Sequence, residues 1–388
     1  MTALEILLRL ISKEVCGHET SEDIASELND ENIKELYAIS KTHDLAHLVG
    51  SALKKTETSV SPELLRPFYD EHLHSVFRYR RFVDELSVIS NLFEEAQIDH
   101  IALKGALLRD FYPEPWMRTS CDIDILVKND DLARACELLS SKAEYKQTAR
   151  TGHDVSFYSP TGVHLELHFS LVEDSIFSDR TYMFESVWDR TVVADGKKHT
   201  YLMTEEMFYF YHIAHMAKHF LCGGCGIRTF LDLWILENRV DFNAEKRAEL
   251  ISEGKFSSFA ENAKRLAAVW FDGAEHDQIS KDFERFVLCG GAYGTVENEV
   301  NLGVAGRGTR AKYIFRRIFP QYNSMKNLYP VLERRKFLLP FCHVRRWFRI
   351  IFRGGVKKAR AEIRQSTNVS SDELDSIKKL ISELGLAN

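Results

Sequence analysis

The sequence is poor in the residues that build disulfide frameworks, linkers and membrane spans. Its 388 residues include seven cysteines and eight prolines. An odd number of cysteines without regular spacing excludes a disulfide scaffold and is typical of reduced thiols in a cytosol-like compartment. No apolar run is long enough for a transmembrane helix, and charges interrupt the N-terminal MTALEILLRLISKEV, which excludes a signal peptide. We therefore expect a cytoplasmic protein that touches membranes only peripherally, if at all.

A strong overall charge is also missing. The 51 Lys and Arg residues against 57 Asp and Glu residues give a net charge of -6. Any attraction to nucleic acid or to a membrane must therefore be local. The only close cysteine pair is Cys222 and Cys225 in LCGGCG. A structural zinc site would need a second such pair, so a glycine-rich helix end is the favoured interpretation.

Hydrophobic spacing divides the chain into three parts. Residues 1–97 and 201–388 show mainly the spacing of amphipathic helices. One such helix carries apolar residues at steps of four and three: Phe82, Leu86, Ile89 and Phe93. Residues 98–200 alternate strand and helix patterns and end in an expected hairpin at 153–169. Because no long linker separates the parts, we expect an α/β unit embedded between helical N-terminal and C-terminal regions.

The strand pattern CDIDILV contains two acidic residues, Asp122 and Asp124. Side chains two residues apart on a strand share a face, so both carboxylates lie opposite the apolar face of Ile123, Ile125 and Val127. Two like charges so close repel each other unless a cation lies between them. Carboxylate oxygens are the ligands that Mg²⁺ prefers, and Mn²⁺ also accepts them. The pair is therefore a candidate metal site.

A third carboxylate strengthens this interpretation. In VHLELHF, Glu166 is a single acid with His164 and His168 on its own face. If this strand lies beside CDIDILV, Glu166 meets Asp122 and Asp124. Three converging carboxylates are typical of a two-metal site, in which one ion holds a triphosphate and the other activates an acceptor oxygen. For the Asp-x-Asp pair alone, an edge strand that shows its acids to solvent is the alternative.

Groups suited to phosphate precede the acidic strand. In LKGALLRD a strand ends at Lys104, and Gly105 lets a phosphate approach the backbone. A helix follows at once, and the amides at its N-terminus attract anions. Lys104 and Arg118 would neutralise phosphate oxygens. Together with the acids, this order of motifs predicts nucleotidyl transfer.

At this point the sequence resembles the DNA polymerase beta-like nucleotidyltransferases, and among them the bacterial family of uncharacterised nucleotidyltransferases. The resemblance lies in ALKGALLRDFYPEPWMRTSCDIDILV, in the Glu166 strand, in HMAKHF followed by GIRTFLDLW, and weakly in YPVLERRKFLLPF, over residues of about 30 to 350. It implies the α+β class, with a small mixed-sheet nucleotidyltransferase core. It also implies Mg²⁺ held by Asp122 and Asp124, and Glu166 as a third ligand or base.

The turn that would contact the phosphates departs from the family pattern. The resemblance matches Gly105 to the glycine of this turn, which is usually followed by Ser or Gly in the superfamily. Here the turn is Lys104, Gly105 and Ala106, so the usual hydroxyl contact to phosphate is missing. The third acid is Glu where Asp is commoner, a longer side chain that still reaches.

The helix pattern HIAHMAKHF places His212, His215 and His219 on one face. Zinc binding would need a further ligand such as Asp232, and buried, hydrogen-bonded histidines are an equal interpretation. We favour a third, in which the helical region closes over the nucleotide. Its triphosphate would then be approached by three side chains, with Asp232 orienting the last of them: Lys218, His219 and Arg228.

The segment 334–364 holds eleven basic residues and one acidic residue. Its apolar residues fall on one helical face: Phe341, Val344, Phe348, Ile351 and Phe352. Three interpretations stay open: this face packs on the preceding domain, lies on an anionic membrane, or accompanies nucleic-acid binding.

The sequence thus predicts a Mg²⁺- or Mn²⁺-dependent nucleotidyltransferase that moves a nucleoside monophosphate from an NTP, by default ATP, to an unidentified acceptor. The altered turn at Lys104 suggests one alternative, a nucleotide-binding module without turnover. The basic segment suggests another, a toxin-like enzyme that modifies tRNA or a protein.

Overall fold

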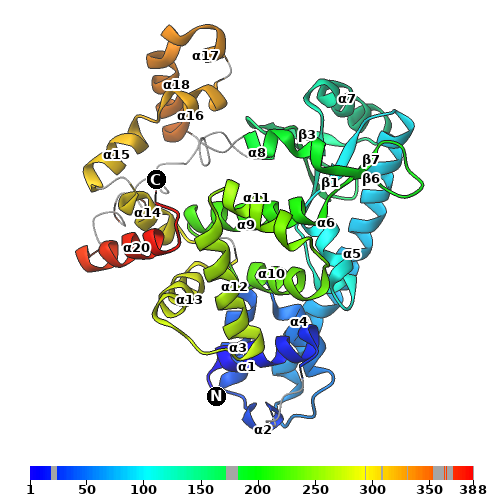
Figure 1. Ribbon diagram of the computed structural model, residues 1–388, viewed down its shortest axis with the longest axis vertical. Coiled ribbons are helices and arrows are strands. Elements are labelled where there is room, and N and C mark those ends of the chain that lie inside the picture. The colour runs from blue at the N-terminus through cyan, green and yellow to red at the C-terminus, as the bar shows by residue number, and fades with distance from the viewer. Residues whose placement is uncertain are drawn as a thin grey trace.

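The computed structural model describes residues 1–18, 24–171, 182–292, 294–306, 309–329, 331–352, 362, 364 and 370–387 (Figure 1). Helices pack together before the sheet begins: α1 (Ala3–Ile11), a π-helical turn (Ser12–Cys16), α2 (Ile24–Glu27), α3 (Asn32–Thr42), α4 (Ala46–Leu53) and α5 (Pro62–Glu95). The first opens with a capping box, because the side chains of Thr2 and Glu5 each accept the other residue's backbone N–H.

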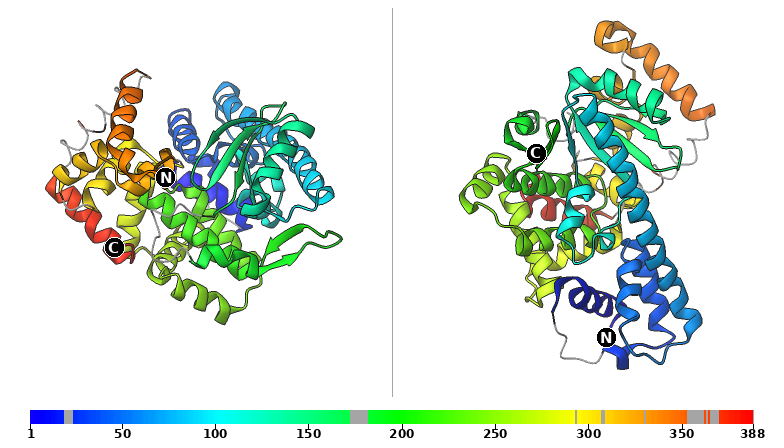
Figure 2. Two further views of the ribbon diagram at one scale, coloured as in Figure 1. Left: turned by 90° about the horizontal axis from the view of Figure 1, so that it is seen from above. Right: turned by 90° about the vertical axis from the view of Figure 1, so that its right-hand side faces the viewer.

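Helix α5 links these N-terminal helices to the sheet. Its 34 residues make it roughly 50 Å long, and Figure 2 shows it running from the blue helices along the side of the sheet. Phe82, Ile89 and Phe93 are buried near its C-terminal end, as their spacing predicts. Leu65 and Phe68 are buried among the N-terminal helices at its other end.

The sheet has seven strands in the order β3-β4-β5-β2-β1-β7-β6. They are β1 (His100–Ala102), β2 (Asp122–Val127), β3 (Lys146–Arg150), β4 (Asp154–Tyr158), β5 (His164–His168), β6 (Thr191–Val193) and β7 (Thr200–Met203). Strand β2 pairs antiparallel with β1 and parallel with β5, and β4 and β5 form the expected hairpin. The sequence pattern did not predict β3, because all its residues are exposed and no apolar alternation marks it. It also missed the short strands β6 and β7.

Further helices lie within and after the sheet region. Within it are α6 (Gly105–Leu108), α7 (Leu132–Lys142) and α8 (Tyr182–Glu185). After it come α9 (Glu205–Leu221), α10 (Ile227–Arg239), α11 (Ala244–Glu253), α12 (Ser257–Asp272), α13 (Gln278–Gly290), α14 (Val296–Ala305), α15 (Arg310–Ile318), α16 (Tyr322–Leu328), α17 (Val331–Arg334), α18 (Leu339–Phe352) and α20 (Ser371–Glu383). None of the helices in the described ranges is long and apolar enough to cross a membrane.

The two faces of the sheet have different surroundings. Ile123, Ile125 and Val127 of β2 are buried in a cluster that also contains residues of α5 and α7. The other face of β2 carries Asp122 and Asp124, which line a cavity together with residues of α9. Strand alternation therefore separates packing from chemistry, as the sequence predicts.

A second and larger apolar cluster joins the two helical regions. It extends from Ile6 to Leu386 and includes residues of α1, α4, α9 to α14 and α20. The helices α15 to α18 (yellow to orange in Figure 1) project beside this body, and a small cluster of their own forms around Met325 and Leu332. The expected α+β architecture, with a small mixed sheet between helical regions, is confirmed.

Candidate active site

The three predicted acids lie on one face of the sheet. In the parallel pairing of β2 with β5, Asp124 is directly opposite Glu166. Asp122 lies two residues before Asp124 on the same face. The Glu166 strand thus lies beside CDIDILV, as expected, and brings the three carboxylates to one place.

Asp124 is the most buried of these acids and already has two cationic partners. Its side chain is 5% exposed, and its Oδ1 atom accepts a hydrogen bond from Lys104 Nζ at 2.8 Å. His168 Nε2 lies 2.9 Å from the same oxygen. Burial alone would raise the pKa of Asp124, but the Lys104 ammonium and the His168 imidazole hold this pKa well below its ordinary value. Asp124 is therefore an anion.

The pKa values of the other two acids shift in opposite directions. Burial and the negative charge of Asp124 raise the pKa of Asp122 to about 6. The hydrogen bond from His168, whose Nε2 atom lies 3.5 Å from Glu166 Oε2, lowers the pKa of Glu166. Such mutual repulsion between neighbouring carboxylates is relieved when a divalent cation binds them.

The donor atoms at this face fit a metal ion. Ligand atoms within 4.8 Å of one another come from Asp122, His164 and Glu166 in one group and from Asp124, Glu166 and His168 in another. Glu166 belongs to both groups. His168 Nδ1 is buried and has no hydrogen-bond partner among the described residues. Carboxylate oxygens suit Mg²⁺, and the added imidazoles are equally compatible with Mn²⁺.

The turn after β1 is tighter than the sequence suggests. Lys104 has φ of 47°, a left-handed backbone conformation that residues other than glycine rarely adopt. A Cβ on Gly105 would lie 2.2 Å from Ser120 Oγ, so any larger residue there would have to displace the Ser120 hydroxyl. The expected anion-binding helix is wrong in one respect: α6 spans only Gly105–Leu108, which is too short for a helix dipole to develop.

Arg118 and Arg228 are each held by an acid, but Asp232 holds Arg118 and not Arg228 as expected. Arg118 Nε donates to Asp232 Oδ1 at 2.7 Å, and Tyr112 donates its hydroxyl to the same oxygen. Arg228 Nη1 donates to Asp44 instead. The prediction that Asp232 orients Arg228 is therefore wrong, because Asp232 is fully buried and is bound by Arg118. Asp44 gave no signal in the sequence, since it lies in a helix connection far from the other motifs.

The histidines on one face of α9 have partners of their own in the structure. His212 is buried, and its Nε2 atom contacts the Thr229 carbonyl oxygen at 3.2 Å. His215 and His219 contact each other, with 3.1 Å between their Nε2 atoms. Burial, followed by the charge of Lys104, lowers the pKa of His219 to about 4. Among the described residues, no group able to hold a metal includes these histidines, and hydrogen-bonded burial describes His212.

A cavity of about 470 Å³ brings the predicted residues together. Its lining includes all nine: Lys104, Gly105, Arg118, Asp122, Asp124, Glu166, Lys218, His219 and Arg228. The sheet contributes Asp122, Asp124 and Glu166, whereas α9 and α10 contribute Lys218 and Arg228; Asp232 of α10 also lines the cavity. The cavity therefore has an acidic wall and a basic wall.

Some lining residues were missed by sequence reasoning. Ser120, His153 and Tyr211 also line the cavity. Ser120 has the hydroxyl that residue 106 lacks, and it lies against Gly105. Tyr211 directly precedes His212 in the helix and is buried. For His153, the neighbouring Asp154 at the start of the hairpin was the one available signal.

Comparisons with known proteins match most of the chain to a family. The model of a family described as "Uncharacterised nucleotidyltransferase" matches residues 29–272, so the C-terminal part of the resemblance, up to about residue 350, lies outside the match. A solved structure of an antigenic nucleotidyltransferase-like protein from Paracoccidioides brasiliensis is 16% identical, with 44% of this chain and 85% of that chain covered. Its TM-score of 0.29 is too low to support an argument. No curated protein matches the sequence.

Proposed function

Because the chain belongs to the family of uncharacterised nucleotidyltransferases, we propose that it moves a nucleoside monophosphate from an NTP to an acceptor, with Mg²⁺ or Mn²⁺ as cofactor. The single observation that carries this proposal is the cavity with one acidic and one basic wall. A triphosphate bound through divalent ions needs both kinds of wall, carboxylates for the ions and cations for the remaining phosphate charge. ATP is the donor proposed by default.

The acids have separate proposed roles. Asp122 and Asp124 would hold the metal ions, and Glu166 would complete the ion on the acceptor side. Bound ions of this kind stabilise the negative charge that develops during transfer. Lys104 must release Asp124 Oδ1, or share it, when the ions bind, because its ammonium lies 2.8 Å from that oxygen.

The proposed reaction is a displacement at the α-phosphorus. An oxygen or nitrogen of the acceptor forms a bond to this phosphorus, and the bond from phosphorus to the bridging oxygen breaks. Pyrophosphate leaves with the electron pair of the broken bond. Glu166 would help to remove the proton from the acceptor, because the hydrogen bond from His168 that lowers its pKa keeps it ionised and so able to accept a proton.

The nucleotide itself would be held mainly by the basic wall. The residues assigned to it are Lys104, Gly105, Arg118, Lys218, His219 and Arg228. Lys218 and His219 approach from α9, and Arg228 from α10. Because Asp232 pairs with Arg118 and Asp44 pairs with Arg228, we assign both arginines a smaller share of the phosphate binding.

A binding module without turnover is the second candidate, since the Lys104 turn is strained and lacks the usual hydroxyl. A toxin-like enzyme is a third candidate, in which the acceptor is tRNA or a protein. The experiment on the main proposal also tests the binding module.

The test is transfer from α-³²P-labelled ATP in the presence of MnCl₂ or MgCl₂, with a cell extract as the source of acceptor. We expect a labelled product and released pyrophosphate, and Asp124→Asn should lower both by roughly a hundredfold or more. Asp130→Asn, an exposed acid of the turn after β2, is the matched control. Binding of ATP by calorimetry without any labelled product would favour the module, and equal labelling by Asp124→Asn would refute the proposed site.

We further propose that the chain functions in the cytoplasm as three regions, 1–97, 98–200 and 201–388, with a peripheral contact through 334–364. Helix α18 supports this contact, because Phe341, Phe348 and Phe352 are 70%, 57% and 78% exposed. The interpretation in which this face packs on the preceding domain is therefore wrong for these side chains. Since exposed arginines border the face, we propose an anionic membrane surface as its partner.

A further inference from the structure

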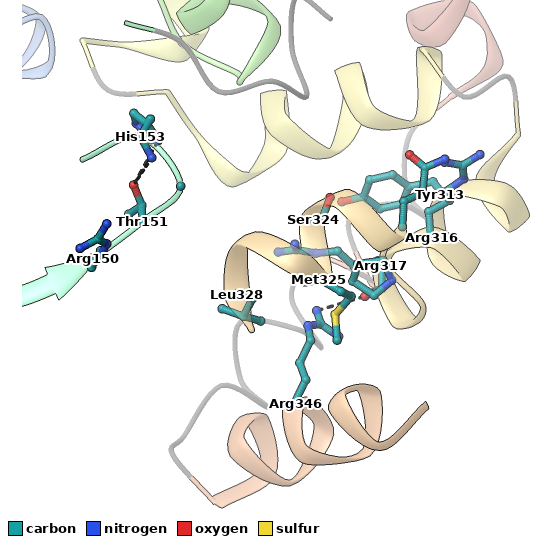
Figure 3. A pocket seen from close by; sticks show the side chains of 13 residues that line it. Arg150, Thr151, His153, Tyr313, Arg316, Arg317, Ser324, Met325, Leu328 and Arg346 are labelled. Atoms are coloured by element: carbon teal, nitrogen blue, oxygen red, sulfur yellow. Dashed lines mark hydrogen bonds between the residues drawn. The ribbon is translucent and has the colours of Figure 1, made fainter. Parts of the chain in front are cut away.

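A second cavity, of about 440 Å³, lies between the turn that joins β3 to β4 and the helices α15, α16 and α18. Figure 3 shows Arg150, Thr151 and His153 on one side of it, with side chains of the C-terminal helices on the other. These helices lie beyond residue 272, where the family match ends. The cavity is therefore a feature of this chain that the family assignment does not explain.

The lining is strongly basic. Four arginines line the cavity, Arg150, Arg316, Arg317 and Arg346, and the lining contains no Asp or Glu. Of these four, Arg317 alone has a carboxylate partner among the described residues, since its Nε and Nη2 atoms donate to Glu362 at 2.7 Å. Within the described part of the chain, Arg150 and Arg316 form no ion pair.

Arg346 is positioned by backbone contacts rather than by an acid. It donates to the carbonyl oxygens of Ile318 and Arg317. Burial and the nearby charge of Arg317 lower the pKa of Arg346. A bound anion stabilises cations that lie so close together, and one guanidinium group can bind two phosphate oxygens at once.

The two cavities are neighbours. Thr151 and His153 line both of them, and the ring centroids of His153 and His168 are 5.8 Å apart. His168 in turn contacts Asp124. A molecule held in the arginine-lined cavity can therefore extend past His153 to the acidic wall where transfer is proposed.

We propose that the arginine-lined cavity binds a phosphate group of the acceptor, so that the acceptor is a phosphorylated compound whose reactive end reaches the acidic wall. That the bound compound is the acceptor rests on the proposed function, whereas phosphate binding in the cavity does not depend on it. The volume is that of a small-molecule site, so the phosphate belongs to a soluble compound or to a lipid headgroup.

The test is the affinity of the full chain for inorganic phosphate, measured by calorimetry in EDTA. The double variant Arg150→Gln/Arg316→Gln removes two cations that hold no other ion pair, so the fold should be preserved. Since two cations that can make charge-assisted hydrogen bonds to phosphate are lost, we expect phosphate affinity to fall at least about tenfold. Lys312→Gln, on α15 but outside the cavity, is the matched control and should leave the affinity unchanged.

Two further measurements separate the possible outcomes. Affinity for ATP with MnCl₂ should be the same in all these proteins; if none binds ATP but the phosphate loss is found, the proposed function fails and the phosphate site stands. Phosphatidylcholine vesicles with phosphatidic acid, competed by inorganic phosphate, distinguish a lipid headgroup from a soluble compound. Unchanged phosphate affinity in the double variant, absence of phosphate binding by the wild type, or binding of single-stranded RNA that phosphate does not compete would each overturn the inference.

Discussion

At the scale of single residues, Lys104 combines two unusual properties. Its backbone has a positive φ, and its ammonium holds the buried Asp124 carboxylate. Strained backbone persists where surrounding contacts enforce it, and it gathers at functional sites. Here the ion pair supplies such a contact, because it draws the side chain of Lys104 toward β2.

Replacing Lys104 should therefore leave the negative charge of the buried Asp124 without one of its two partners. In EDTA, Lys104→Met should lower the free energy of unfolding by roughly 2–3 kcal/mol, because a buried carboxylate loses one of its two partners. Added MnCl₂ should restore more stability to this variant than to the wild type, since the ion replaces the missing cation. Urea unfolding with and without MnCl₂ measures both effects.

Lys128→Met is the control for this prediction. Its ammonium also pairs with an aspartate, Asp99, at 2.6 Å, but the Lys128 side chain is 45% exposed. A pair at such a site contributes little, typically below about 1 kcal/mol. If Lys104→Met is destabilised no more than Lys128→Met, or if MnCl₂ restores neither, Lys104 does not balance the charge of Asp124.

At the scale of elements, the sequence predicted those strands in which one face is apolar and the other polar. The alternation in β2 and β5 correctly separated Ile123 and Leu165 from Asp124 and Glu166. It could not reveal β3, whose residues are all exposed, or the partner of Arg228. Asp44 lies 184 residues away in sequence, and only the packing of α10 against the N-terminal helices brings the two together.

Helix α18 is the element whose apolar face has no cover in the described structure. The rings of Phe348 and Phe352 stack with centroids 5.9 Å apart, and the side chains of Arg345 and Arg349 are exposed beside them. Lipid insertion of both rings would bury a large apolar area while the arginines meet anionic headgroups.

We therefore expect the protein to sediment with vesicles of phosphatidylcholine and phosphatidylglycerol, and not with phosphatidylcholine alone. Phe348→Ser/Phe352→Ser should reduce the bound fraction at least about tenfold, since each buried Phe contributes roughly 1.5–3 kcal/mol. Phe77→Ser, an exposed Phe of α5, is the matched control. Binding that is unchanged in the double variant would show that another surface contacts the vesicles.

At the scale of the whole molecule, buried histidines join the N-terminal helices to the rest. His43 is 1% exposed, and its Nδ1 atom accepts a hydrogen bond from the backbone N–H of Ile227. Burial lowers the pKa of His43 to about 4. The junction between α3 and α10 therefore requires a neutral imidazole.

This requirement makes stability depend on pH. Between the ordinary pKa of about 6.5 and the folded value of about 4, the unfolded chain binds more protons than the folded one. Stability is therefore complete above the upper value and is lost as pH falls through this window, by about 2 kcal/mol between pH 7 and pH 5 for His43.

The variant His43→Asn should remove that part of the pH dependence, because the Asn side-chain oxygen can accept the same hydrogen bond without titrating. Urea unfolding at pH 7, 6 and 5 checks it. The exposed His74, changed to Asn, should behave as the wild type. An equal loss of stability in His43→Asn and the wild type would place the acid sensitivity elsewhere.

Helix α5 contributes to two apolar cores, and this limits where the chain can be truncated. Phe82, Ile89 and Phe93 back the apolar side of β2, whereas Leu65 and Phe68 belong to the core of the N-terminal helices. A fragment that starts at residue 98 would keep every proposed catalytic side chain and lose the support behind it. We therefore expect the smallest fragment with the proposed activity to include α5. The helix before the sheet would support the site as much as the sheet does.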